Sequence, residues 1–276
     1  MERIREAVER ARRERQGSGA GPGRAAVPEG NRDSEAKEDL DQIVYTSTRV
    51  VDVPRALLRD RHVVSGLDPC AFTEAFKILS TRVSRILHER HWSTLAVTSA
   101  TEGEGKTLVA INLAISLARQ FQRTALLVDA DMRKPSVGEY FGLKSAPGLS
   151  HYLNDDKPIE DLLINPGIPG FVFLPGGSPQ PHSSEMLGWE KTRNLVEEMK
   201  TRYPSRIVIF DLPPIFAGAD VLAFAPHVEA MLLVVEEGGP KLEDIRHAAD
   251  LLASTHLIGT VLSKSREPVV SVYGRL

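Results

Sequence analysis

One stretch, residues 97–107, reads Val-Thr-Ser-Ala-Thr-Glu-Gly-Glu-Gly-Lys-Thr and constrains the fold more than any other part of the chain. It follows an apolar, strand-like run and precedes a segment of helical character, 108–122. The stretch fits the pattern of a phosphate-binding loop, with Ala100 in place of the first glycine. Gly103 and Gly105 permit a tight turn that brings backbone N–H groups against phosphate oxygens. The following helix N-terminus also attracts anions. The stretch therefore predicts a strand, a nucleotide-binding loop and a helix in succession.

Two side chains of this loop have chemistry suited to a magnesium–nucleotide complex. The Lys106 ammonium is within reach of the β- and γ-phosphates, and the Thr107 hydroxyl is a ligand for Mg²⁺. An ordinary glycine-rich turn between a strand and a helix is the alternative, but the strand–loop–helix context that the motif requires is present. The predicted nucleotide-binding residues are Thr101, Glu102, Gly103, Glu104, Gly105, Lys106, Thr107 and Leu108.

Composition limits the remaining choices. The 276 residues are 42% hydrophobic and 26% charged, which is enough for one large globular domain with appendages. A net charge of -3 gives no indication of a nucleic-acid partner. The single cysteine, Cys70, excludes an intramolecular disulfide and fits a reducing cytosol. No run of about 18 apolar residues occurs, so we expect no transmembrane helix. The N-terminus is charged throughout, so we expect no signal peptide.

Apolar, β-branched runs alternate with helix-like segments from residue 71 onward. The predicted strands are Thr94–Ser99, Thr124–Asp129, Phe171–Leu174, 207–211, 230–235 and 258–262, and the predicted helices are 71–90, 106–122, 136–142, 159–164, 184–202, 217–225 and 241–254. Several strands lack polar alternation, as strands buried on both faces do. The sequence therefore predicts an α/β fold over 71–265, with a doubly wound, mostly parallel sheet and helices on both faces.

The segments outside this domain differ in composition. Residues 1–15 alternate Arg and Glu and predict a short amphipathic helix, either solvated or docking to a partner or membrane. Residues 16–40 are rich in Gly, Pro and Ser and predict a flexible linker. Residues 41–70 form an N-terminal extension that we leave unassigned. The polar tail, 266–276, contains one tyrosine, Tyr273.

Aspartates stand at the ends of two of the predicted strands, where open α/β sheets bind their ligands. Asp129 and Asp131 alternate along an extended segment, so both point to the same side. Asp211 follows four apolar residues, as does the carboxylate that orients Mg²⁺ in the second motif of nucleotide sites. An aspartate at a strand end is more often a turn former or a helix cap. Together with the phosphate loop, these residues favour a nucleotide site.

The sequence resembles the bacterial tyrosine kinases (BY-kinases) in three elements that occur in the same order. These are the phosphate loop, the segment with Asp129 and Asp131, and the segment with Asp211. The closest resemblance is to the exopolysaccharide branch, which includes the autokinases of exosortase systems. It extends over about residues 72–272 and includes stretches such as Arg-Lys-Pro-Ser at 133–136 and Leu-Pro-Gly-Gly at 174–177. The resemblance implies a P-loop NTPase fold, ATP-dependent tyrosine autophosphorylation and control of exopolysaccharide synthesis or export. Residue types and spacing alone indicate a hydrolase or transferase that uses a magnesium–nucleotide complex.

The resemblance also implies roles for single residues. Asp129 would accept the proton of the tyrosine hydroxyl, and Arg133 would support the surrounding residues. The implied catalytic residues are Lys106, Asp129, Asp131 and Asp211, with Thr107, Asp131 and Asp211 holding Mg²⁺, the two aspartates through water. Tyr273 is the expected phosphoacceptor and Tyr45 its competitor. The implied partners are a membrane-embedded polysaccharide co-polymerase (chain-length) activator and further copies of the chain. The implied location is cytoplasmic, peripheral at the inner face of the membrane.

Three features depart from the family pattern. The tail has a single tyrosine rather than a cluster. The helix before the phosphate loop carries Glu74, Lys77 and Ser80 where many members have the ring-forming Glu-x-x-Arg-x-x-Arg, and Lys lacks the guanidinium fork. Ser263 stands where many members have asparagine near the adenine.

Two rival functions remain open at this point. A partition or division-site ATPase would switch between states without phosphorylating protein. Such proteins carry a second lysine near the start of the loop, where this chain has Thr101. A nucleotide-binding regulatory scaffold with weak kinase activity is the other alternative.

Overall fold

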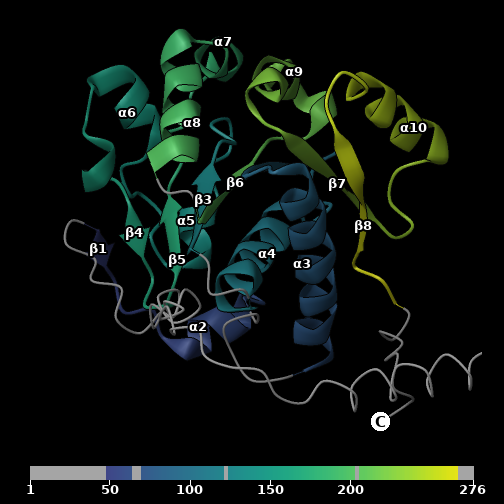
Figure 1. The fold of residues 1–276 in the computed structure, drawn as a ribbon, viewed down its shortest axis with the longest axis horizontal. Coiled ribbons are helices and arrows are strands. Elements are labelled where there is room, and N and C mark those ends of the chain that lie inside the picture. The colour runs from purple at the N-terminus through teal and green to yellow at the C-terminus, as the bar shows by residue number, and fades with distance from the viewer. Residues whose placement is uncertain (1–47, 64–69, 121–123, 203–204, 267–276) are drawn as a thin grey trace, which may run out of the picture. The chain divides into compact units, whose positions relative to one another are not determined.

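Within the residues that the structure describes, eight strands form one sheet in the order β1-β4-β5-β3-β6-β2-β7-β8 (Figure 1). The structure is a computed structural model that describes residues 48–63, 70–120, 124–202 and 205–266. All of these lie in one compact unit, Asp39–Leu276. The strands are β1 (Arg49–Val50), β2 (Thr94–Ser99), β3 (Thr124–Asp129), β4 (Ile164–Asn165), β5 (Phe171–Leu174), β6 (Arg206–Asp211), β7 (Ala230–Glu236) and β8 (Leu257–Ser263).

Six adjacent strands, from β5 to β8 along the sheet, run parallel, and β4 pairs antiparallel with β5 at one side. The central strands are buried at nearly every position, because helices cover both faces of the sheet. This arrangement confirms the predicted α/β fold with a doubly wound, mostly parallel sheet.

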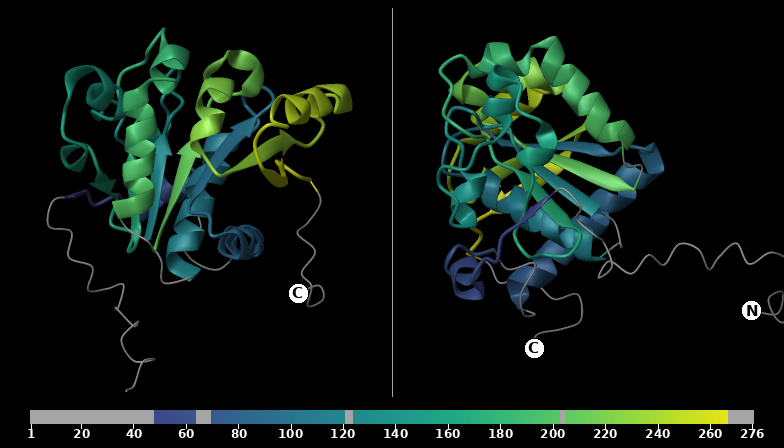
Figure 2. Two further views of the ribbon diagram at one scale, coloured as in Figure 1. Left: turned by 45° about the horizontal axis from the view of Figure 1, so that its top comes forward. Right: turned by 90° about the vertical axis from the view of Figure 1, so that its left-hand side faces the viewer.

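The helices divide between the two faces. One face packs against α2 (Arg55–Asp60), α3 (Ala71–Arg90), α4 (Lys106–Gln120) and α5 (Val137–Tyr140). The other packs against α6 (Leu149–Asp155), α7 (Ser183–Leu187), α8 (Glu190–Arg202), α9 (Asp220–Phe224) and α10 (Leu242–Leu251). Figures 1 and 2 show these two sets of helices on opposite sides of the sheet.

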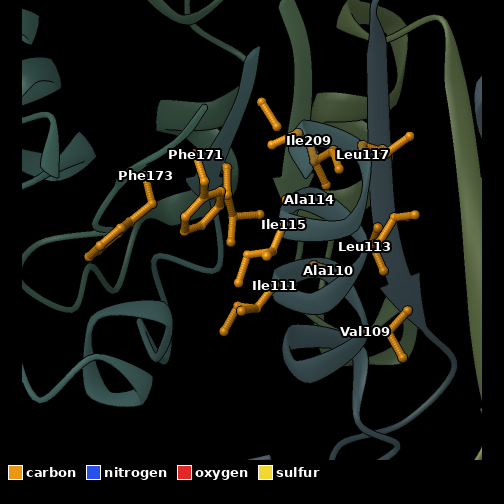
Figure 3. Close-up of a cluster of buried hydrophobic side chains, with 14 of the residues drawn as sticks. Val109, Ala110, Ile111, Leu113, Ala114, Ile115, Leu117, Phe171, Phe173 and Ile209 are labelled. Atoms are coloured by element: carbon orange, nitrogen blue, oxygen red, sulfur yellow. The ribbon is translucent and has the colours of Figure 1, made fainter. Parts of the chain in front are cut away.

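Helix α4 lies at the centre of the first layer, directly after the phosphate loop. Its buried side chains include Ile111 and Ile115, which lie on the side facing Phe171 and Phe173 of β5 (Figure 3). Deleting one such buried aliphatic side chain typically costs about 2–5 kcal/mol. The first turn of α4, which carries Lys106 and Thr107, is therefore fixed by a tightly packed helix behind it.

Several predicted helices differ from the structure. Two helices, α7 and α8, occupy the region where a single helix was expected over 184–202. The first of them ends at Gly188, a residue of low helix propensity. The helix expected over 159–164 is only a short 3₁₀ turn, Ile159–Asp161, and Ile164 instead pairs with Phe173 in the sheet. Helices expected over 136–142, 217–225 and 241–254 are shorter: α5, α9 and α10. Helix α6 was not predicted.

The extension left unassigned from sequence contributes to this domain. Strand β1 joins the sheet beside β4, and Val53, Leu58 and Val63 are buried in the core of the first layer. The sheet therefore begins before residue 71. The expected helix at 1–15, the linker at 16–40, Tyr45 and Tyr273 lie outside the described residues.

The topology brings the sequence motifs together at one edge. Strands β2, β6 and β3 are neighbours, and Asp211 is in register with both Val97 of β2 and Asp129 of β3. Because these strands are parallel, their carboxyl ends lie side by side. The phosphate loop, the 129–131 segment and Asp211 converge there.

Candidate active site

The loop between β2 and α4 has the backbone of an anion-binding turn. Gly103 and Gly105 have φ values of 83° and 87°, a region that side-chain-bearing residues rarely adopt. A Cβ on Gly103 would meet nothing within 4 Å, so the backbone conformation, and not crowding, calls for glycine there. This geometry agrees with the predicted phosphate-binding role of the loop.

Glu104 is buried beneath the loop and fastens it to the sheet. Its carboxylate accepts hydrogen bonds from the backbone N–H and hydroxyl of Thr101 at 2.5 and 2.8 Å, and from the N–H of Glu236 at 3.1 Å. Ser263, at the end of β8, donates its hydroxyl to the Glu104 carbonyl at 2.5 Å. Glu104 and Ser263 therefore shape the loop, a task that the sequence did not reveal for Ser263.

Lys106 is the cation of the phosphate loop. Its ammonium lies 2.8 Å from Asp131 Oδ2 and 3.6 Å from Asp211 Oδ1. Burial lowers the pKa of Lys106, but the Asp211 and Asp131 carboxylates raise it further, so the pKa lies above its usual range and the side chain is charged. The loop lysine and the two predicted metal-binding aspartates thus form one ion cluster.

Thr107 connects this cluster to the second acidic motif. Its hydroxyl donates to Asp211 Oδ2 at 2.6 Å and lies 3.3 Å from the hydroxyl of Ser136. Asp211 is fully buried at the end of β6, and burial raises its pKa above the usual range. The arrangement brings the two predicted magnesium ligands from different motifs into direct contact.

Asp129 is buried at the end of β3. Its Oδ2 accepts the backbone N–H groups of Ser136 and Val137, both at 2.9 Å, and its side chain is fully buried. Burial, followed by repulsion from Asp211, raises the pKa of Asp129 to about 8. In this conformation Asp129 fixes the segment that carries Ser136 and does not line the pocket.

A pocket of about 820 Å³ opens above the loop. Its walls come from the phosphate loop, the segment after β3, the segment after β5 and the segment after β6. The lining residues are Glu102, Gly103, Gly105, Lys106, Thr107, Asp131, Arg133, Lys134, Ser136, Tyr140, Pro179, Gln180, Pro181, Pro213, Pro214 and Ala217. Of the predicted nucleotide-binding residues, Thr101, Glu104 and Leu108 are not part of this lining.

Several lining residues were not predicted from sequence. Tyr140 is the last residue of α5 and lines the pocket, and burial raises the pKa of its hydroxyl group. Gln180 and its flanking prolines follow β5, held by the Gln180 N–H on the Met132 carbonyl at 2.8 Å. No local motif marks these positions, because the fold brings them to the pocket from distant parts of the chain.

The oxygen atoms of the side chains at this site suit a magnesium ion that is bound together with phosphate. Among the described residues, no group of three or more His, Cys, Asp or Glu side chains could hold a metal ion. Asp129 Oδ1 and Asp211 Oδ1 are buried without a hydrogen-bond partner. Mg²⁺ commonly binds one or two protein groups, with water and substrate phosphates completing its shell. Thr107, Asp131 and Asp211 therefore fit such an ion.

Sheet order, loop and acidic residues together define a P-loop nucleotide-binding protein. No family model matches the chain. It is 30% identical over 217 residues to the tyrosine-protein kinase YwqD of Bacillus subtilis, covering 78% of this chain and 90% of that one. It is also 30% identical to a putative tyrosine-protein kinase in the cps region of Klebsiella pneumoniae, over 73% of this chain but only 28% of that protein.

Solved structures agree with these relatives. The tyrosine kinase domain of BceF is 25% identical with a TM-score of 0.65, and the match covers 78% of this chain and 91% of that domain. An McdA protein of Cyanothece, at 18% identity and a TM-score of 0.53, shares the fold alone; that match covers 62% of this chain and 70% of McdA. The chain belongs to the bacterial tyrosine kinases, the family that its motifs indicated.

No helix in the described ranges is both long and apolar enough to cross a membrane.

The position of Lys106 leads to a first prediction. Replacing Lys106 with Met should lower the turnover of ATP roughly 10²–10³-fold, because a preorganised charge at the phosphates is lost. Lys157→Met, at an exposed position, is the matched control and should retain wild-type turnover. Circular dichroism should show both variants folded. Near wild-type turnover in Lys106→Met would mean that the site is assigned wrongly.

Proposed function

We propose that this chain is an ATP- and Mg²⁺-dependent protein tyrosine autokinase that regulates exopolysaccharide synthesis or export. The observation that carries the proposal is the contact of Lys106 and Thr107, which line the pocket, with Asp131 in the same lining and Asp211 buried beneath it. The sequence relatives, named tyrosine-protein kinases, supply the reaction class. The Klebsiella relative, from a cps region, supports the link to polysaccharide.

In this proposal each residue has a physical task. The loop amides and Lys106 bind the nucleotide phosphates, so Lys106 exchanges its contact with Asp131 for one with phosphate oxygens. Thr107, Asp131 and Asp211 hold Mg²⁺, with the aspartates acting through water. Bound Mg²⁺ neutralises charge on the phosphates. Asp129 is the proposed acceptor of the tyrosine proton, which requires the 133–137 segment to shift, because its N–H groups cover that carboxylate.

The proposed phosphoacceptor is Tyr273. Strand β8 ends at Ser263 against the phosphate loop, so the tail begins beside the site. The residues from 267 to 273 span at most about 25 Å when extended. That reach supports entry of the tail into a neighbouring molecule's site. Among the other described tyrosines, Tyr140 and Tyr152 lie in the helices α5 and α6, and of these two only Tyr140 lines the pocket.

Partners and location are proposed from the family. A membrane-embedded polysaccharide co-polymerase would activate the chain, and copies of the chain would associate with each other. The chain would then lie at the cytoplasmic face of the membrane, with residues 1–15 as the contact. On α3, Lys77 pairs with Glu74 at 2.6 Å, and Ser80 is buried against Ser116 of α4 at 3.1 Å. Ser80 is thereby occupied within the fold, so self-association would use other groups.

The partition-type ATPase is the second candidate. The fold shared with McdA, which was solved with ATP, is compatible with any nucleotide-binding protein of this fold and does not single out this candidate. The position near the loop start holds Thr101, whose hydroxyl donates to Glu104 within the same loop. A threonine held in this way offers no cation to a second subunit, which favours the kinase. The regulatory scaffold would bind the nucleotide with weak turnover and act by regulating a membrane partner.

The metal ligands can be tested by titration. Asp131→Asn and Asp211→Asn should each raise the Mg²⁺ concentration required for half-maximal ATP turnover, because each removes charge beside the ion. Asp161→Asn, on the 3₁₀ turn after α6, is a matched control and should leave the titration unchanged. An unchanged Mg²⁺ requirement in both test variants would remove these residues from the metal site.

The acceptor can be identified by peptide mass spectrometry after incubation with Mg-ATP. Wild type should carry phosphate on Tyr273, and Tyr273→Phe should lose most of its phosphotyrosine. Phosphate confined to Tyr45, or equal total phosphotyrosine in both proteins, would reject the tail as acceptor. Tyr45→Phe is the matched variant and should behave as wild type.

The membrane contact can be tested by truncation. A chain that starts at Asp41 lacks the proposed helix and linker. In cells the full chain should be recovered in the membrane fraction and the truncated chain should leave it, because the proposed contact with the partner or membrane is gone. A truncated chain that fractionates like the full chain would exclude residues 1–15 as the anchor.

A further inference from the structure

A second cation, Arg133, faces the pocket and is held by a buried carboxylate outside the phosphate loop. Arg133 follows β3 and lines the pocket. Its Nε and one terminal nitrogen both lie 2.8 Å from Asp220 Oδ2. Asp220, in the first turn of α9, is 1% exposed, whereas Arg133 is 36% exposed. The carboxylate is therefore inside the fold, and the guanidinium extends from it to the pocket.

The pair is fixed from both sides. Asp220 Oδ1 accepts the hydroxyl of Ser183, a fully buried residue at the start of α7. Gly218 makes room for the pair, because a Cβ there would lie 2.7 Å from an Arg133 nitrogen and 2.9 Å from Asp220 Oδ2. The segment after β3, the start of α7 and the start of α9 thus meet at the Asp220 carboxylate.

The guanidinium has more donors than Asp220 uses. Two of its five N–H groups contact the carboxylate. The described residues provide Arg133 with no other hydrogen-bond partner, and the same side chain lines the pocket that contains Lys106. A planar cation oriented in this way is suited to bind phosphoryl oxygens.

We infer that Arg133 binds the phosphoryl group during its transfer, and that Asp220 and Ser183 are positioning residues for Arg133. This inference rests on the proposed function. In the step, the bond between the γ-phosphorus and the bridging oxygen of ADP breaks. A bond from that phosphorus to the acceptor oxygen forms, and the acceptor proton leaves to a base or to water. Negative charge accumulates on the oxygens around phosphorus, where Arg133 stabilises it.

The experiment compares chemistry with binding in the full chain. Arg133→Met should lower kcat for ATP hydrolysis and for tyrosine phosphorylation by at least about tenfold, while the Kd for Mg-ADP, which lacks the transferred group, changes less than about threefold. Asp220→Asn and Ser183→Ala should lower both rates by smaller factors. Arg193→Met, which removes a surface arginine paired with Glu190, is the matched control and should match wild type.

Two further measurements separate a role at the phosphoryl group from a purely structural one. Arg133→Ala should regain part of its hydrolysis rate when guanidinium is added at millimolar concentration, whereas Lys106→Met should not. If Arg133→Met unfolds because Asp220 is left buried and unpaired, the double variant Arg133→Met with Asp220→Asn removes both charges. That variant should be folded and as slow as Arg133→Met.

Four results would overturn the inference. These are unchanged hydrolysis in a folded Arg133 variant, a Kd for Mg-ADP that weakens as much as kcat falls, no response to guanidinium, and a loss of phosphotyrosine with normal hydrolysis. The last would mean that Arg133 contacts only the acceptor. If the wild-type chain hydrolyses ATP without forming phosphotyrosine, the proposed kinase function fails, while the hydrolysis measurements still decide the role of Arg133.

Discussion

The site depends on the Lys106 ammonium group and on the aspartate carboxylates around it, whose positions are fixed by the fold. Lys106 lies beside Asp131 and Asp211, and Asp129 is held next to them at the end of the adjacent strand. Burial, followed by repulsion from neighbouring carboxylates, raises the pKa of Asp129 and that of Asp211. One lysine only partly compensates three aspartates. The cluster therefore favours additional positive charge, such as a magnesium ion delivered with a nucleotide.

The sheet produces this crowding by its strand order. β2, β6 and β3 are adjacent and parallel although they are far apart in the sequence, so their carboxyl ends supply the loop and the aspartates at a single edge. Helix α4 packs against this sheet (Figure 3). This packing fixes Lys106, which lies in the first turn of the helix. Core packing and site geometry thus have the same origin, the parallel sheet buried on both faces.

The sequence was sufficient for the parts governed by local pattern. Three strands, β2, β3 and β5, have the predicted bounds, because each is a run of apolar residues ended by a turn. The sequence was insufficient for features that depend on contacts between distant segments of the chain. Ile164 reads as part of a helix but pairs with Phe173. The partner of Arg133, Asp220, is 87 residues away and follows no motif. The phosphate loop was recognisable locally, but its fastening through Ser263 was not.

The most direct measurement is phosphoamino-acid analysis of the purified full chain after incubation with Mg²⁺ and ATP labelled at the γ-phosphate. The account predicts that the label is recovered on the protein as phosphotyrosine, and that omission of Mg²⁺ abolishes it. Hydrolysis of ATP without any label on tyrosine would contradict the kinase and favour a nucleotide-driven switch. Label on serine or threonine alone would contradict the tyrosine specificity.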